Sequence, residues 1–433
     1  MSQKTTESST SSAAKVTHAL KVLGDIQEKR DEEIAKYSSE AIHDESDIES
    51  DSKSPLFDRF YANGGSKTLL QMTNFNCREI DHLWHRCCTV LNEKFTLGRG
   101  KKTDVSPKDI LFIVLCVVKT PTNWDLMGEI FEKKGPTLQR LFSRAVDILS
   151  PILYQDYVLN CFAKLSMTTL INKKAQFKNF PCALYATDVI FQQANRPSGN
   201  MLEGKHYFSG KHKLYGFKTE VSVTPSGQAV DVTDHSTGSI SDFVIFWNNL
   251  NFHNQALKKF GDDTKIADDI EMSSKFPDSW AILMDKGYQG AHQYVRAIIP
   301  KKKPHGKMIS IEDASWNATV SSDRIIVENY FGRLTKLWGI IASKFKWGEE
   351  SYDALFRLCV ALTNYHISLH PLRDEEDAAH YTRYNNRNYV MGEKLATKRK
   401  MTQKKYREKR RKRIEQDMGV SEDGSSIDSG EGS

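Results

Sequence analysis

Three acidic residues stand where a fold could bring them together for chemistry. Asp188 follows the strand-like run CALYAT, Asp285 follows the run AILM, and Glu328 lies in the helical pattern DRIIVENYFGRL. Three converging carboxylates cannot all be buried as bare anions, because like charges a few ångströms apart repel strongly. Mg²⁺ binds carboxylate oxygens while it keeps several waters, and a pair of divalent ions can activate water against a phosphodiester. The three acids therefore indicate metal-dependent phosphodiester chemistry.

The elements around these acids predict an α/β fold that places them together. Consecutive strands commonly form a meander, and a crossover helix then sets the next strand parallel to the first. Asp188 and Asp285 would then end neighbouring strands at one sheet edge, with Glu328 on the following helix. The pattern predicts strands over 182–189, 214–225, 227–235 and 281–288, and helices over 238–250 and 321–345.

Each acid also has a structural interpretation. The two strand-end acids could be turn residues, since Asp and Gly commonly end strands. Glu328 could face solvent and pair with Arg324, one helical turn earlier. Asp242 is three residues after Ser239, the spacing of a capping box, so it is either a helix-capping residue or a further metal ligand.

Composition limits the class of protein. The chain has 433 residues, 39% of them hydrophobic, which suffices for one large and one smaller domain. No apolar run reaches the roughly 18 to 20 residues of a membrane span, and the N-terminus has no apolar signal core. The seven cysteines are scattered without CxxC pairs, which favours a reducing compartment. We expect a soluble, intracellular protein without a membrane partner.

The two ends of the chain differ from its middle. Residues 1–55 are rich in Ser, Thr and acids, and we expect a disordered arm. We also expect a disordered tail over 371–433, although its run 398–413 carries eleven Lys or Arg and one Glu. Such a basic run attracts polyanions and is typical of nuclear import signals, so we expect the nucleus, with a solvated tail as the alternative.

Residues 56–155 have helical spacing. Helices near 108–119, 123–132 and 136–149, with a Gly turn before the last, resemble a helix-turn-helix whose final helix would present Arg140 and Arg144 to a DNA groove. The same spacing fits a plain helical bundle, and both interpretations stay open.

Other basic residues are candidates for contact with DNA phosphates. Phosphate neutralisation by such side chains gives sequence-independent affinity that falls with salt, but lysine-rich loops are as often simply solvated. The candidates flank the second strand or lie between Asp285 and Glu328: Lys211, Lys213, Lys301, Lys302 and Lys303.

Several motifs occur together in a fixed order. They are TDVIFQQANRP, YFSGKHKLYGFKTEVSVTPSG, GSISD, ILMDKGYQG, IIPKKKP, DRIIVENYFGRL and LTNYHISLHPLR. In this combination they resemble the DDE endonuclease domain of PIF/Harbinger-type transposases, and the resemblance covers about residues 60–372. The segment GRGKKTDVSPKDILFIVLCVVKTPTNWDLMGEIF resembles the N-terminal helix-turn-helix region of the same family.

The resemblance implies an RNase H-like mixed sheet with flanking helices over 180–370, preceded by the all-α region. It implies Mg²⁺- or Mn²⁺-dependent DNA cutting and joining, with the triad on Asp188, Asp285 and Glu328. Asp242 is part of the family pattern, and Arg324 and Lys336 fall near its basic positions. Val189 stands where relatives often have Gly, and Lys336 is one residue later than is common.

The resemblance also implies a separate Myb-like DNA-binding partner, and a homo-oligomer stays open. We therefore expect a two-metal DNA endonuclease and transposase. The alternative is a domesticated nuclear protein that binds DNA without cutting it. A small-molecule hydrolase that uses two carboxylates explains neither the basic run nor the N-terminal helices.

Overall fold

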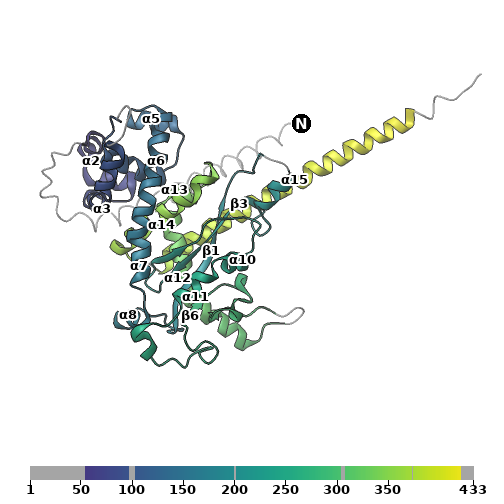
Figure 1. Ribbon diagram of the computed structural model, residues 1–433. Coiled ribbons are helices and arrows are strands. Elements are labelled where there is room, and N and C mark those ends of the chain that lie inside the picture. The colour runs from purple at the N-terminus through teal and green to yellow at the C-terminus, as the bar shows by residue number, and fades with distance from the viewer. Residues whose placement is uncertain (1–53, 97–102, 199–200, 304–307, 373, 421–433) are drawn as a thin grey trace, which may run out of the picture.

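The computed structural model describes residues 54–96, 103–198, 201–303, 308–372 and 374–420 (Figure 1). The expected N-terminal arm lies almost wholly outside these residues and stays a prediction. None of the described helices is both long and apolar enough to span a bilayer.

Helices form the first part of the described chain. Ser106 Oγ accepts from the amide of Asp109 and starts one helix, and Asn123 Oδ1 accepts from the amide of Leu126 and starts the next. The helices predicted here from apolar spacing are confirmed. The helices within the predicted region are α2 (Pro55–Thr73), α3 (Cys77–Thr96), α4 (Pro107–Lys119), α5 (Trp124–Phe131) and α6 (Gly135–Tyr154). Three further short helices, which were not predicted, follow them: η1 (Gln155–Leu159), α7 (Asn160–Ala163) and α8 (Met167–Asn172).

A mixed sheet follows, as predicted. Its order is β2-β3-β1-β6-β7, with β4 and β5 also paired to β3. β1 and β3 are antiparallel, β3 and β4 are antiparallel, and β6 runs parallel to β1. The strands are β1 (Ala183–Gln193), β2 (Phe208–Ser209), β3 (Leu214–Val223), β4 (Ala229–Val232), β5 (Ser236–Thr237), β6 (Ala281–Leu283) and β7 (Ala297–Ile298).

Helices cover both faces of this sheet. Ala186 and Ile190 of β1 join a larger core with the long helix α12 (Ile311–Leu337), whereas Tyr185 and Val189 pack in a smaller core with α10 (Asp242–Asn248) and α11 (Leu250–Ala256). The larger core also includes α4, α6 and α14 (Tyr352–Leu369), so it runs through both the all-α and the α/β regions. The remaining helices are α9 (Met201–His206), α10 (Asp242–Asn248), α11 (Leu250–Ala256), η2 (Gly261–Lys265), η3 (Lys286–Tyr288), η4 (Ala291–Gln293), α12 (Ile311–Leu337), α13 (Gly339–Ala342), η5 (Glu349–Ser351) and α14 (Tyr352–Leu369).

The last helix corrects the expectation of a disordered tail over residues 374–420, whereas residues 421–433 of that expected tail lie outside the described residues. α15 (Asp374–Val420) is one continuous helix that includes the basic run 398–413. Its first part packs into the larger core through Tyr381 and Tyr384, and its second part projects away from the body of the molecule (Figure 1). Lys, Arg, Glu and Gln are good helix formers, and this propensity outweighs the missing apolar periodicity that suggested disorder.

Candidate active site

The sheet register places two of the predicted acids side by side. Ala186 of β1 pairs with Leu283 of β6, and Asp188 and Asp285 each follow two residues later. β6 ends at Leu283, whereas β1 continues to Gln193, so Asp188 lies within its strand rather than at the end predicted for it. The site therefore lies where β6 ends and β1 continues without a parallel neighbour on that side. A polar side chain at this position is not enclosed between two strands.

α12 contributes the third acid and an arginine that joins all three. Arg324 Nη1 donates to Asp188 Oδ2 at 2.7 Å, and Nη2 donates to Glu328 Oε1 at 2.9 Å. Nη2 also lies 3.4 Å from Asp285 Oδ1. We call Asp188, Asp285 and Glu328 the carboxylate cluster. Its members come from three elements, and they converge on one guanidinium.

A neighbouring acid fixes α12 against the start of β1. Asp323 is buried, and its Oδ2 accepts from the backbone amides of Asn179 at 2.8 Å and Phe180 at 2.9 Å. The Asn179 side chain also donates to Asp323 Oδ1 at 2.7 Å. Because Asp323 directly precedes Arg324, this anchor sets the position of the guanidinium over β1. Sequence alone does not predict this role, since one Asp in a helix gives no signal of its distant partner.

Electrostatics distinguish the members of the cluster. Burial raises the pKa of Asp188 to about 6, Arg324 opposes that rise, and the charge of Asp285 adds to it. The three acids raise the pKa of Arg324 against the effect of burial, so Arg324 stays charged. Side-chain exposure is 18% for Asp188, 35% for Asp285 and 34% for Glu328, so all three can be reached from solvent.

The charge and chemistry of the cluster fit a divalent cation. One guanidinium faces three carboxylates, which leaves a formal charge of −2 when all three are ionised. Carboxylate oxygens are the donors that Mg²⁺ prefers. Within the described ranges no three acidic, His or Cys side chains are arranged as ligands of a single ion. The guanidinium occupies the point of convergence, so a cation requires that Arg324 give up at least one carboxylate.

Asp242 lies beside the cluster but is already paired. Its Oδ1 is 3.0 Å from Lys218 Nζ, which also donates to the carbonyl of Ile240 at 2.7 Å. A Cβ on Gly287 would lie 2.7 Å from Asp242 Oδ2, so the turn after Asp285 packs closely on this acid. The charge of Asp242 contributes to the raised pKa of Asp188.

The start of α10 differs from the capping box considered for it. The N-cap residue is Ser241, whose Oγ accepts from the amide of Val244 at 3.3 Å, and not Ser239. Asp242 is the first residue of the helix, where its charge also complements the helix dipole.

A second buried polar group lies on the α10 and α11 face of the sheet. Glu220 Oε1 is 3.0 Å from His253 Nε2, and His253 Nδ1 is 2.9 Å from the Tyr185 hydroxyl. Both Glu220 and His253 are fully buried. Lys218 and Glu220 were not predicted, although two charged residues spaced two apart in a buried strand are a usable signal.

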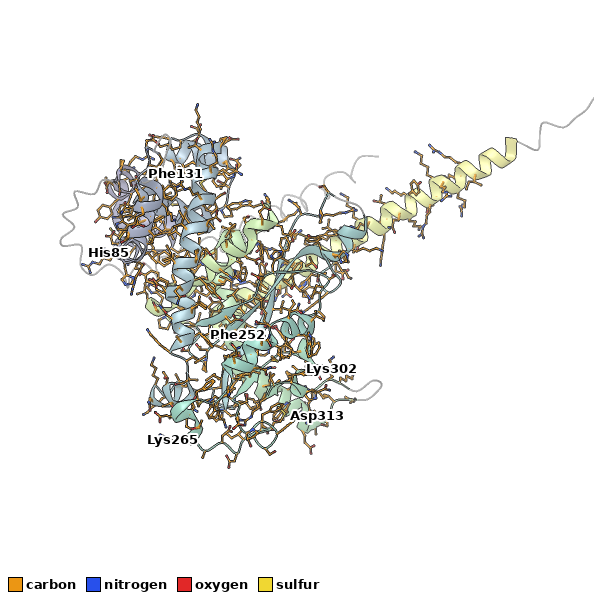
Figure 2. All side chains as sticks on the ribbon, viewed as in Figure 1. His85, Phe131, Phe252, Lys265, Lys302 and Asp313 are labelled. Atoms are coloured by element: carbon orange, nitrogen blue, oxygen red, sulfur yellow. The ribbon has the colours of Figure 1, made fainter. Side chains whose placement is uncertain are left out.

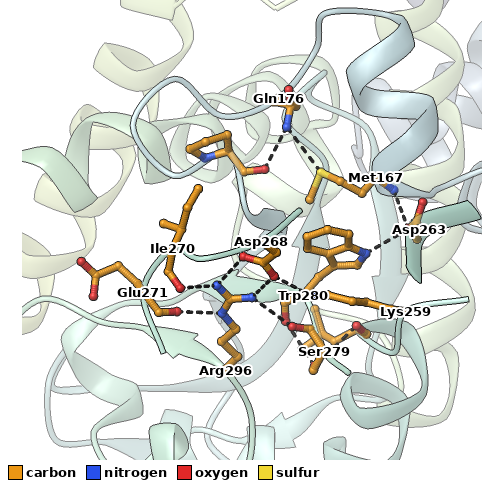
Figure 3. A network of polar contacts seen from close by, with 12 residues as sticks. Met167, Gln176, Lys259, Asp263, Asp268, Ile270, Glu271, Ser279, Trp280 and Arg296 are labelled. Carbon is orange, nitrogen blue, oxygen red and sulfur yellow. Dashed lines mark hydrogen bonds and ion pairs between the residues drawn. The ribbon is translucent and has the colours of Figure 1, made fainter. Parts of the chain in front are cut away.

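The other end of β6 is held by a different network (Figure 3). Asp268 accepts from both terminal nitrogens of Arg296, and Lys259 Nζ lies 2.7 Å from Asp268 Oδ2. Asp263 Oδ2 accepts from Trp280 Nε1 at 2.9 Å. We call Lys259, Asp263, Asp268, Trp280 and Arg296 the base network. It ties the loop before β6 to β7 and so supports the strand from which Asp285 emerges.

The predicted loop lysines lie at separate places. Lys302 and Lys303 are exposed, and Figure 2 shows Lys302 near Asp313 in the lower part of the molecule. Lys301 Nζ is 2.8 Å from Asp313 Oδ1. Lys211 is exposed at the β2–β3 turn, and Lys213 pairs with Glu393 of α15.

The remaining predicted basic residues lie on helices. Arg140 and Arg144 are exposed on α6, but Arg144 also donates to the carbonyl of Lys94 and covers the Phe95 ring. Lys336 is half-buried in the last turn of α12, two turns beyond Glu328. Among the predicted basic residues, Arg324 is the one whose side chain pairs with all three acids of the carboxylate cluster.

Comparison with known proteins gives two matches to this region. Residues 187–364 match the family model described as DDE superfamily endonuclease, and this segment contains the whole carboxylate cluster. A probable transposase for insertion sequence element IS702 from Microchaete diplosiphon is 26% identical over 187 residues, which are 43% of this chain and 58% of that relative. No solved structure matches the chain. The part of the chain that holds the cluster is similar to a DDE superfamily endonuclease.

Proposed function

We propose that this protein is a metal-dependent DNA endonuclease that cuts and joins phosphodiester bonds as a transposase. The proposal rests on one observation: three carboxylates from β1, the end of β6 and α12 converge on a single guanidinium with negative charge in excess. The endonuclease match and the similarity to a probable transposase support it.

Asp188, Asp285 and Glu328 would hold two Mg²⁺ or Mn²⁺ ions. Bound there, the ions lower the pKa of water and offset the charge on the phosphate oxygens. Strand and helix positions hold the three acids in place, and Arg324 would become available to a phosphate once it released a carboxylate to a cation. Water adds to phosphorus, the bond from phosphorus to the 3′ oxygen breaks, and the proton lost by the water is balanced by one that the departing 3′ oxygen gains.

The resulting 3′-hydroxyl can then attack a target phosphodiester without a covalent protein intermediate. Positioning and charge neutralisation supply most of the catalysis in such a mechanism. The mixed sheet supports an RNase H-like fold for this region. Asp242 would act beside the ions once Lys218 releases it, and the predicted lysines would bind flanking phosphates.

Finer assignments follow from the sequence resemblance. We assign the PIF/Harbinger subtype from the ordered motifs, and with it a Myb-like DNA-binding partner. The helix-turn-helix role of α4 to α6 is supported by the exposure of Arg140 and Arg144. The basic run supports a nuclear location. A homo-oligomer stays open.

Nicking of supercoiled plasmid in MnCl₂ tests the chemistry. We expect nicks with the wild type and at least about a 1,000-fold lower rate with Asp285→Asn, since a metal ligand is lost. Asp262→Asn is the matched control, because Asp262 is an exposed Asp that pairs with Lys265 only three residues away. This control should nick as the wild type does.

Two results would overturn the proposal. Equal nicking by wild type and Asp285→Asn would show that the cluster is not the site. Binding of DNA by the wild type without nicks at any Mg²⁺ or Mn²⁺ concentration would favour the domesticated DNA-binding protein, and the bridging role of Arg324 would then be purely structural.

A further inference from the structure

The last part of α15 is a helix that the body of the protein does not cover. Every residue from Thr397 to Ile414 is exposed, and Figure 1 shows this segment projecting well beyond the sheet. We call residues 398–413 the basic arm. A helix of 16 residues is about 24 Å long, the length of roughly seven base pairs of B-form DNA.

The base of the arm is fixed to β1 and the β2–β3 turn. The Tyr384 hydroxyl donates to the carbonyl of Phe191 at 3.0 Å, and the Tyr389 ring stacks on His212 at 5.2 Å. A Cβ on Gly392 would lie 2.0 Å from the His212 carbonyl oxygen, so only glycine allows this close approach. Burial lowers the pKa of His212 to about 3, so the ring stays neutral while it is stacked.

Ionic and cation–π contacts continue this attachment to the start of the arm. Lys213 pairs with Glu393, and the Arg399 guanidinium lies 5.9 Å from the Phe208 ring and 5.5 Å from the Tyr215 ring. The direction of the arm is therefore set by the sheet to which β1, β2 and β3 belong. α15 packs on α12 through Tyr381 and Phe331, passes the β2–β3 turn at His212 and then projects outward (Figure 1).

The charges surround the arm on all sides. Consecutive helical residues are separated by about 100°, so a dense basic run leaves no apolar stripe. An amphipathic helix for a membrane surface or a protein groove needs such a stripe. The arm also places like charges four residues apart, as at Lys400 and Lys404, which disfavours the helix until anions neutralise them.

We propose that the basic arm lies in the major groove of duplex DNA, as a sequence-independent contact outside the active site. A helix with side chains is about 10–12 Å wide, which matches the roughly 12 Å major groove of B-form DNA. Basic residues on every side then reach phosphates of both strands. The major groove of A-form RNA is too deep and narrow for this mode, so duplex DNA is the favoured partner over duplex RNA.

The first test removes the charge and keeps the helix. Lys404, Lys405, Arg407, Lys409, Arg410 and Arg411 are changed to Gln in the full chain, and binding to a 30-base-pair duplex of arbitrary sequence is measured in EDTA. We expect about a 100-fold loss of affinity at moderate salt and a salt dependence of log K weaker by roughly 3 to 5 units of slope. Lys265→Gln is the control, because Lys265 is an exposed lysine outside the arm that pairs with Asp262, and it should bind as the wild type does.

The second test keeps the charge and breaks the helix. Pro in a helix interior removes a backbone hydrogen bond and breaks the helix, so Thr402→Pro should lower duplex affinity about tenfold, whereas Thr402→Ala should not. Circular dichroism of the wild type should show more helix when duplex DNA is added. The Thr402 side chain donates within the helix to the Lys398 carbonyl at 3.0 Å, so the Ala control changes little else.

Three outcomes would overturn the proposal. Unchanged affinity in the Gln variant excludes the arm as a DNA contact. Equal affinity in Thr402→Pro and Thr402→Ala shows a flexible polycation and not a groove-bound helix. Equal or tighter binding to duplex RNA or to anionic phospholipid vesicles assigns the arm to another partner. Since binding is measured without divalent cations, failure here is distinct from failure of the nicking experiment.

Discussion

Two arginines near β6 form ion pairs with carboxylates, yet they do so in opposite ways. Arg296 gives all five of its N–H donors to Asp268 and to the carbonyls of Ile270, Glu271 and Ser279. Arg324 is shared by three carboxylates, and its buried Nε has no hydrogen-bond partner in the described parts of the chain. An arginine whose donors are all hydrogen-bonded stabilises the fold. An arginine that faces three carboxylates leaves an excess of negative charge, which a cationic ligand can neutralise.

The acids show the same contrast. Burial raises the pKa of Asp268, but Arg296 and Lys259 outweigh burial, so its pKa lies below the ordinary value. Burial also raises the pKa of Asp188, and there Arg324 does not compensate, so the pKa reaches about 6. Each pair contains an arginine and an Asp that burial affects, and the balance of cations and anions around that Asp decides the direction of its pKa shift.

Removal of Arg296 should have the largest effect on stability. Arg296→Met leaves Asp268 buried with Lys259 alone and leaves three carbonyls without their donor, so we expect a loss of about 3–5 kcal/mol in the free energy of unfolding. Urea unfolding in EDTA and in MgCl₂ measures this loss of stability, and Mg²⁺ should not restore it. Lys265→Met, at an exposed lysine, is the control. If Arg296→Met lost no more stability than this control, Arg296 would have no structural role.

Removal of Arg324 should lower the free energy of unfolding by less, and added metal should restore that stability. The cluster acids are partly exposed, so Arg324→Met is expected to lose about 1–3 kcal/mol in EDTA, the cost of uncompensated charge near the surface. Mn²⁺ or Mg²⁺ should restore this stability, because a cation that binds only the folded state stabilises it. The rise in Tm on adding metal should exceed that of the wild type. If metal raised the Tm of Arg324→Met and of Arg296→Met equally, the proposed difference between the two arginines would be wrong.

The sequence predicted the cluster better than the base network, for a physical reason. Asp188 and Asp285 follow strand patterns, and the rule that a crossover sets strands parallel is enough to make them neighbours. Arg324 and Glu328 are one helical turn apart, so their contact follows from spacing. The loop that carries Asp268 has no hydrophobic periodicity. Arg296, the partner of Asp268, is 28 positions further along the chain, so no local pattern links the two residues.

Two other features could be predicted only in part. Asp188 was expected at a strand end, but the register shows β6 ending while β1 continues, and strand length depends on the partner strand. The basic run is evident in the sequence, but the sequence does not predict that it is helical. An exposed helix without an apolar face lacks the periodic pattern that indicates a helix. Its aromatic anchors, such as Tyr389 on His212, depend on tertiary packing.

Removal of charge from Asp188 should stabilise the metal-free protein. Its raised pKa means that the contribution to stability is full below the unfolded value of 3.8 and is lost as the pH rises through about 6. Asp188→Asn should therefore be about 1–2 kcal/mol more stable than wild type at pH 8 in EDTA, and similar to it near pH 4. Asp268→Asn is the matched comparison and should be less stable than wild type at pH 8. A destabilised Asp188→Asn at pH 8 would contradict this account.

The smallest effect should come from Lys259, the second cation of the base network. Lys259→Met leaves Arg296 on Asp268, so we expect a loss of only about 0.5–1.5 kcal/mol near neutral pH. The effect of Lys259→Met should be clearest in how the free energy of unfolding depends on pH below neutrality. The lowered pKa of Asp268 gives stability that is present above 3.8 and is lost as the pH falls through the folded-state pKa. Without Lys259 the folded-state pKa of Asp268 rises toward its ordinary value, so the loss should be smaller and should be complete at a higher pH. Acid titration of the unfolding free energy measures this shift, and an unmoved acid limb would mean that Arg296 alone sets the pKa of Asp268.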